Sequence, residues 1–437
     1  MRLLKLLLLF LVLTALFLLP GFATAAPSIQ HWTTANGARV YFISTPELPM
    51  VDIQVVFDAG SARDNGLPGL ARLTNVLLDS GTAQHSADAI AERLDAVGAQ
   101  FSSGTLRDMA WLSLRSLSDP LYFKPAVETV AHLLQAPAFA PQALERERNR
   151  IIAAVRELSQ SPDALAEQAF YRALYGTHPY ASPPEGTEAS LKVITREAVR
   201  AFYQRYYVAN NAVVAIVGDL ERAAAEELAV ALVGNLPVGQ PAPPLPKASP
   251  LAKANTVHIP YPSSQTHIYI GQLGMKRGDS DYYSLYLGNH VLGGNGLVSK
   301  LTEEVREKRG LSYGVYSYFA PMAQAGPFVV ALQTRNAQAD QAVNVVKSTL
   351  QDFIENGPNA EGLTTARQNL TGGFALRIDS NGELVQYLAM LGFYQLPLDH
   401  LQTFPNKIED VSREQISSAF QQHIQPQRLI TIMVGGT

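Results

Sequence analysis

The amino-acid sequence predicts an α+β protein made of two homologous domains, each an α/β sandwich. Three observations lead to this prediction. A segment of helix and strand recurs 217 residues later, a proline-rich stretch separates the two copies, and strands and helices come in clusters within each copy. Clustering of this kind favours helices packed against a mixed or antiparallel sheet over a strictly alternating parallel fold.

The repeat is clearest near the end of each half. Each copy has a Ser or Thr suited to cap a helix, an acidic residue in the first turn, and an apolar strand that ends in glycine: Thr195, Glu197 and 212–218 in the first, Ser412, Glu414 and 429–435 in the second. All pairs keep one offset (412 − 195 = 217) without a gap. Because cap, helix, strand and glycine match together, the sequence predicts a duplicated domain.

The same offset sets the domain boundaries. Residues 236–250 contain six prolines and predict a stiff, extended linker. We therefore expect a first domain over residues 26–235 and a second over 251–437. Hydrophobic periodicity predicts strands at 38–44, 51–58 and 267–272, and helices at 67–78, 86–97, 121–135, 141–158, 282–292 and 297–309, the last ended by Gly310.

The first 25 residues have the pattern of a secretory signal peptide. Arg2 and Lys5 precede an apolar run over 6–19, and Ala23-Thr24-Ala25 supplies small residues for cleavage. An uncleaved membrane anchor is the alternative. No later stretch is long and apolar enough to span a bilayer, so we expect an exported protein without stable membrane insertion after cleavage.

Composition excludes several classes of function. The chain has no cysteine, which rules out disulfides, thiolate metal ligands and a cysteine nucleophile. Hydrophobic residues make up 47% of the chain and charged residues 16%, so stability must come from a large apolar core. The net charge of −4 gives no reason to expect a nucleic-acid partner.

Several motifs resemble the insulinase/pitrilysin family of zinc peptidases. They are Ala59-Gly60-Ser61, Gly69-Leu70-Ala71, Gly81-Thr82, His178-Pro179-Tyr180, Glu185-Gly186-Thr187-Glu188, Tyr206-Tyr207, Asn210-Asn211, Leu292-Gly293-Gly294 and the run from Arg306 to Tyr313. The resemblance covers essentially the whole chain after the signal peptide and includes the duplication. It implies a fold in which the two domains form one half of a clamshell.

In that family, zinc is held by an HxxEH motif on a helix and by a glutamate on a later helix. Aligned with this chain, the two histidines fall on Arg72 and Val76, the glutamate between them falls on Asn75, and the later glutamate falls on Ala154. None of these residues can replace its counterpart, since valine cannot bind zinc and asparagine cannot act as a general base. The comparison therefore implies that this chain holds no metal.

No other catalytic pattern replaces the lost one. The nine histidines show no HExxH, HxxEH or HxxxH spacing, and the sequence has no GxSxG motif. His258 and His267 flank an expected turn, but packing or surface roles are the better interpretation for each histidine. Gly293 to Gly296 lack the Lys-Ser/Thr pair of a phosphate-binding loop, so we interpret them as a tight turn.

The second half keeps one feature of the family. Arg306 and Tyr313 match an arginine and a tyrosine that reach toward the zinc and bind the substrate backbone. Both residues could donate hydrogen bonds to a carbonyl that gains negative charge. The alternative is structural: Arg306 ends a predicted helix, where cations are favoured, and Tyr313 begins a strand-like run of tyrosines.

Three functions follow from the resemblance. The first is the non-catalytic, substrate-binding subunit of a bacterial periplasmic heterodimer, in which Arg306 and Tyr313 act on a peptide held at the zinc of an HxxEH-bearing homologous partner. The second is a scaffold or peptide-binding protein no longer linked to proteolysis. The third is a metallopeptidase whose zinc ligands the motifs do not reveal.

Overall fold

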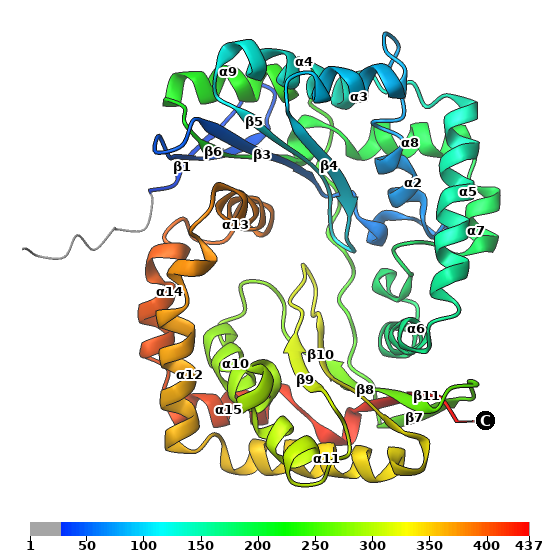
Figure 1. Ribbon diagram of the computed structural model, residues 1–437, viewed down its shortest axis with the longest axis vertical. Coiled ribbons are helices and arrows are strands. Elements are labelled where there is room, and N and C mark those ends of the chain that lie inside the picture. The colour runs from blue at the N-terminus through cyan, green and yellow to red at the C-terminus, as the bar shows by residue number, and fades with distance from the viewer. Residues whose placement is uncertain (1–27, 437) are drawn as a thin grey trace, which may run out of the picture.

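The computed structural model describes residues 28–436, so the expected signal peptide lies outside the described residues. Two sheets, each with helices on both faces, form two connected lobes (Figure 1). The predicted α+β class with two homologous sandwiches is therefore confirmed. No helix within the described part of the chain has the length and apolar character needed to cross a membrane.

The two sheets share one strand order. The six-stranded sheet of the first half runs β1-β2-β6-β3-β5-β4 and the five-stranded sheet of the second runs β7-β11-β8-β10-β9. The strands are β1 (Gln30–Thr33), β2 (Arg39–Ser44), β3 (Met50–Phe57), β4 (Gln100–Thr105), β5 (Ala110–Leu117), β6 (Ala212–Gly218), β7 (Asn255–Ile259), β8 (Gln265–Leu273), β9 (Val315–Phe319), β10 (Pro327–Arg335) and β11 (Ile430–Val434). Apart from β1, each strand has its counterpart in the same place, as expected for a duplicated domain.

The glycine that ends each repeat has a packing reason. A Cβ on Gly218 would lie 2.4 Å from the carbonyl oxygen of Met50, and one on Gly435 would lie 2.6 Å from that of Gln265. Both strand ends therefore need a residue without a side chain. Thr195 and Ser412 cap their helices as predicted, each accepting a hydrogen bond from the backbone three residues on.

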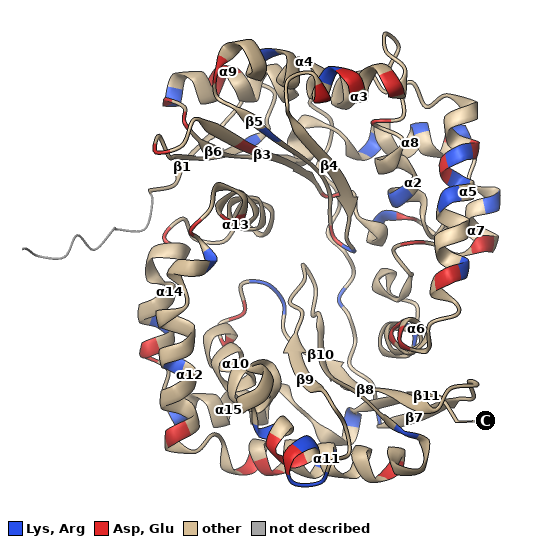
Figure 2. Ribbon diagram, in the orientation of Figure 1, with Lys and Arg blue, Asp and Glu red and all other residues tan. Residues whose placement is uncertain are grey.

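Helices cover the outer face of each sheet. In the first half they are α2 (Leu70–Val76), α3 (Ala87–Asp95), α4 (Pro120–Gln135), α5 (Pro141–Leu158), α7 (Glu188–Val193), α8 (Arg196–Tyr206) and α9 (Arg222–Val233). In the second half they are α10 (Tyr282–Asn289), α11 (Ala339–Asn356), α12 (Ala360–Gly372), α14 (His400–Glu409) and α15 (Arg413–His423). Charged side chains are frequent on these outer helices, notably α3 and α5 (Figure 2).

The inner face of each sheet is covered by a helix from the other half. Helix α13 (Asn381–Tyr394) packs on β6, β3 and β2, whereas α6 (Pro162–Tyr175) packs on β11 and β8 (Figure 1). Gly392 of α13 allows a close approach, because a Cβ there would lie 2.6 Å from both Tyr41 and Val213. The apolar cores of the two halves are thus continuous through exchanged helices.

This exchange predicts that the first half is not stable alone. Without α13, a fragment of residues 26–235 would expose the fully buried Val56, Val213 and Val217 on the inner sheet face. We expect it to aggregate and to bind a hydrophobic dye strongly, and to recover a compact form when mixed with residues 251–437. A soluble monomer that unfolds cooperatively by itself would contradict this.

The proline-rich segment 236–250 contains no helix or strand. It is held along the surface by side chains of the first half that donate to its carbonyl groups. Arg63 Nη1 lies 2.7 Å from Pro243 O, and His178 Nε2 lies 2.9 Å from Pro246 O. Because His178 Nδ1 accepts from the backbone of Tyr180, its Nε2 carries the proton, and the histidine has a structural role.

One predicted helix is wrong at its start. The helix expected over 297–309 begins only at Lys300, and Thr302–Glu307 is a π-helix. Residues 296–298 form a separate 3₁₀ turn, and the helix predicted over 282–292 is α10 followed by a second π-helical stretch, His290–Gly294. A Cβ on Gly293 would lie 2.4 Å from Ser317 Oγ, so packing against β9 requires glycine here.

Candidate functional site

Helix α2 carries three of the four positions that the sequence resemblance assigns to the zinc site, namely 72, 75 and 76. Its N-terminus is capped by a buried side chain: the two carboxylate oxygens of Asp64 accept from the backbone N–H groups of Gly69 and Ala71, each at 2.8 Å. Gly69 lies against Gly186, which leaves no room for a side chain on either residue. Two of the motifs that suggested the family therefore meet where α2 begins.

The three positions expected to carry zinc ligands and the one expected to carry the general base hold no metal-binding group. Asn75 is buried, and its Nδ2 lies 3.4 Å from both Trp111 O and Tyr207 Oη. Val76 packs on the outer core of the first half, Arg72 is half-exposed, and Ala154 is exposed on α5. Zinc needs nitrogen, sulfur or carboxylate donors, so these residues do not fit a zinc ion.

Asp64 gives a prediction for the pH dependence of stability. Burial raises the pKa of its carboxyl to about 7, in spite of the two N–H groups that favour the charged form. Because the folded pKa exceeds the unfolded value, the stabilising contribution is complete below pH 4 and is lost as the pH rises through 7.

Raising the pH from 5 to 8 is therefore expected to lower the free energy of unfolding by roughly 2–4 kcal/mol more in the native chain than in an Asp64→Asn variant. Urea unfolding at both pH values measures the difference. The same pH dependence in the two proteins would show that Asp64 is ionised throughout this range.

In the second half, the structure brings Arg306 and Tyr313 together. Arg306 lies in the last turn of the π-helix Thr302–Glu307, and its guanidinium carbon lies 4.9 Å from the centre of the Tyr313 ring. Its neighbours Lys308 and Arg309 take up the carboxylate of Glu304. Arg306 itself forms no ion pair with any residue in the range 28–436, so its guanidinium is available to a ligand.

Tyr313 is exposed but held in a fixed loop. Its side chain is 83% exposed, whereas Leu311, Ser312 and Val315 on either side are buried. Ser312 Oγ donates to Gln333 O at 2.8 Å, which fixes the loop to β10. A large aromatic residue held outward on an anchored loop suits contact with a ligand more than packing. Arg306 and Tyr313 are therefore close together and open to solvent, and their role in binding a substrate stays a prediction.

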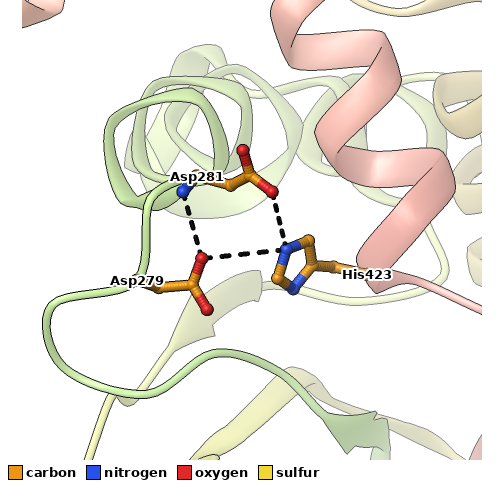
Figure 3. A group of neighbouring side chains, drawn as sticks. All are labelled: Asp279, Asp281 and His423. Atoms are coloured by element: carbon orange, nitrogen blue, oxygen red, sulfur yellow. Dashed lines mark hydrogen bonds and ion pairs between the residues drawn. The ribbon is translucent and has the colours of Figure 1, made fainter.

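One other group of side chains could hold an ion. In the described part of the chain, Asp279, Asp281 and His423 place three donor atoms within 4.8 Å of one another (Figure 3). His423 Nε2 lies 2.9 Å from Asp281 Oδ2 and 3.9 Å from Asp279 Oδ1. This group links the last turn of α15 to the start of α10, where an ion pair accounts for it without a metal.

The sequence did not reveal this group, because His423 lies 142 residues beyond Asp281 and no local spacing connects them. His258 and His267 do not approach each other as ligands: His258 Nε2 bonds Gly435 O at 2.8 Å, and His267 Nδ1 lies 3.4 Å from Asp163. The expectation that this chain binds no metal stays a prediction.

Comparison with known proteins decides the family. The model of the insulinase family (peptidase family M16) matches residues 39–188, and that of the peptidase M16 inactive domain matches residues 194–370. A crystal structure described as the peptidase M16 inactive domain from Pseudomonas fluorescens is 39% identical, with a TM-score of 0.91 over 94% of this chain and 98% of that one. The chain belongs to the insulinase family.

More distant relatives of this insulinase-family chain carry contrasting names. A non-peptidase homolog from Helicobacter pylori is 26% identical over 95% of both chains, and an uncharacterized zinc protease from Bacillus subtilis is 24% identical over 80% of this chain and 85% of that one. A protease structure from Helicobacter pylori, 18% identical with a TM-score of 0.86 over 94% of this chain and 100% of that chain, shows the fold alone.

Proposed function

We propose that this chain is the non-catalytic, substrate-binding subunit of a heteromeric zinc peptidase, and that it acts in a bacterial periplasm. Its partner would be a homologous chain that carries HxxEH and the zinc. The carrying observation is an asymmetry between the repeats: α2 has lost every metal-binding side chain, whereas Arg306 and Tyr313 stand together on an anchored, exposed loop.

The chemistry expected of this chain is binding and polarisation. Tyr313 Oη can donate one hydrogen bond and the Arg306 guanidinium several, to the backbone of a peptide held between the two subunits. Donors fixed in place before the reaction stabilise the negative charge that develops on a carbonyl oxygen during attack by water. The partner's zinc would activate that water, and this chain would orient the peptide.

The relatives have names of both kinds: an inactive domain and a non-peptidase homolog support an inactive role, whereas others are named zinc proteases. The loss of all three ligand positions and of the general base favours an inactive role. An exposed tyrosine beside an unpaired arginine favours substrate binding over a scaffold that has lost all contact with peptides.

The test compares the purified chain, an HxxEH-bearing homologue encoded nearby, and their mixture on a library of unstructured peptides. We expect a complex in size-exclusion chromatography and chelator-sensitive cleavage by the mixture, with none by this chain alone. Robust chelator-sensitive cleavage by the chain alone, or one equivalent of zinc in the purified chain that is required for cleavage, would overturn the proposal. Failure of the pair to associate would favour a scaffold or peptide-binding role.

A further inference from the structure

A large cavity lies between the two halves, away from Arg306 and Tyr313. Its volume is about 800 Å³, and it is bounded by the inner face of β4 and β5, by α13, and by residues 320–322, which follow β9. The β9–β10 hairpin reaches toward β4 and α13 (Figure 1). Residues from both halves of the chain therefore form this cavity.

The cavity offers an apolar surface centred on Trp111. The indole ring lies flat against β4 because residue 104 is glycine: a Cβ there would lie 2.6 Å from the ring. Met109, Met322 and Met390 complete the apolar lining. A half-exposed tryptophan among methionines can adapt to apolar side chains of different shape.

Five charged side chains line the cavity: Asp52, Arg107, Asp108, Arg115 and Arg277. Arg115 Nε forms an ion pair with Asp52 at 2.8 Å, and the carboxylate of Asp108 accepts hydrogen bonds from neutral donors of both halves. Arg107 and Arg277 form no ion pair with any residue of the described chain. Because the three arginines outnumber the two aspartates, the lining carries a net positive charge.

Both free arginines are held ready for a ligand. Arg107 Nε donates to Tyr180 O at 3.2 Å and Arg277 Nε donates to Pro321 O at 3.1 Å, which leaves the two terminal nitrogens of each guanidinium for other partners. Arg107 also stacks on Tyr171, 3.4 Å from the ring centre. Arg107 lies between this cavity and a second, smaller one, which it lines together with Tyr171 and Glu167; Glu167 is near Arg107 but forms no ion pair with it. Guanidinium groups fixed in this way suit a carboxylate.

We propose that this cavity binds an acidic segment of a peptide, with carboxylates on Arg107 and on Arg277 and a neighbouring apolar side chain on Trp111. If the peptide is a substrate, an extension that rests on the function proposed above, the cavity would select peptides that carry Asp or Glu at some distance from the bond that is cut. Residues 313 and 320 are joined by β9, so at most about 23 Å of extended chain separates Tyr313 from the cavity wall. A peptide of about seven or more residues can span both.

The test uses Trp111 as its own reporter. The chain has two tryptophans, Trp32 and Trp111, so a Trp32→Phe background isolates the fluorescence of Trp111. We would titrate it with an octapeptide that holds two Asp beside Leu, and with the same peptide carrying Asn for Asp. We expect the acidic peptide to shift Trp111 emission and to bind at least about tenfold more tightly than the Asn peptide.

Matched variants locate the effect. Arg277→Gln and, separately, Arg107→Gln are each expected to weaken binding of the acidic peptide about tenfold or more and to leave binding of the Asn peptide unchanged. Arg335→Gln, an exposed arginine outside the cavity, should have no effect. Thermal unfolding would confirm that the variants fold.

Equal affinity for the two peptides, or unchanged binding in both folded cavity variants, would overturn the proposal. The measurement needs no partner, so its outcome is separate from that of the peptidase assay. If the pair cleaves peptides but Trp111 does not respond, the cavity proposal fails and the subunit role stands. If Trp111 responds but no partner is found, the cavity proposal stands alone.

Discussion

Replacing Tyr313 by phenylalanine is expected to lower the turnover of the assembled peptidase by about 100-fold, the usual consequence of losing one hydrogen-bond donor to a developing oxyanion. The substitution removes only the hydroxyl group. Because the ring is 83% exposed and its loop is anchored by Leu311 and Ser312, the stability of the chain should not change. The expected loss is in kcat, with a smaller change in KM.

Tyr316→Phe is the matched control. Tyr316 is also exposed and lies three residues away on β9, but it stacks on Tyr318 and is not paired with Arg306. Steady-state kinetics of the two mixtures with the HxxEH partner, at equal complex concentration, measure the difference. Equal turnover of Tyr313→Phe and Tyr316→Phe would remove the Tyr313 hydroxyl from the mechanism.

The largest loss of stability is expected from Asp108→Ala. Asp108 is 3% exposed and its carboxylate accepts hydrogen bonds from the hydroxyl groups of Tyr180 and Tyr394 and from the backbone N–H of Ala323, the last two at 2.9 and 2.8 Å. Tyr180 belongs to the first half, and Tyr394 and Ala323 to the second. Alanine would leave three donors without this acceptor, among them the hydroxyl group of the fully buried Tyr180, and would break the contact between the two halves, for which we expect a loss of about 3–5 kcal/mol.

Urea unfolding measures the free energy of unfolding of Asp108→Ala, with Asp95→Ala as the matched control. Asp95 is an exposed carboxylate at the end of α3 with no hydrogen-bond partner in the described chain, so its loss should change stability by less than about 0.5 kcal/mol. Adding Tyr180→Phe and Tyr394→Phe to Asp108→Ala should recover part of the loss, because the orphaned donors are removed with the acceptor. A strictly additive triple variant would contradict this explanation.

Much of this architecture can be predicted from the sequence, because neighbouring residues determine it and because the same pattern occurs in both halves of the chain. The caps at Thr195 and Ser412 and the strands that follow them need only neighbouring residues, and the constant offset links the two copies. The absence of zinc ligands from α2 and the presence of Arg306 and Tyr313 can be predicted for the same reason, because each is a short motif that can be aligned with the family.

Features that depend on contacts between residues far apart in the sequence could not be predicted from it. The apolar residues of α6 and α13 would be the same whichever sheet each helix covers, so the sequence pattern cannot assign the partner of either helix. The carboxylate of Asp108 finds Tyr394 across 286 residues.

The crossed helices also bear on the origin of the chain. A single ancestral copy of the repeat would have left the inner face of its sheet bare, and its own inward helix could not have covered it from the place it occupies here. Two copies related by a twofold axis, each lending its helix to the other, solve that problem at once, as in domain-swapped dimers. The present chain has the arrangement that an end-to-end fusion of such a dimer would produce. Two copies within one chain need not stay identical, and here α2 of the first has no metal-binding side chain, whereas the second carries the neighbouring Arg306 and Tyr313.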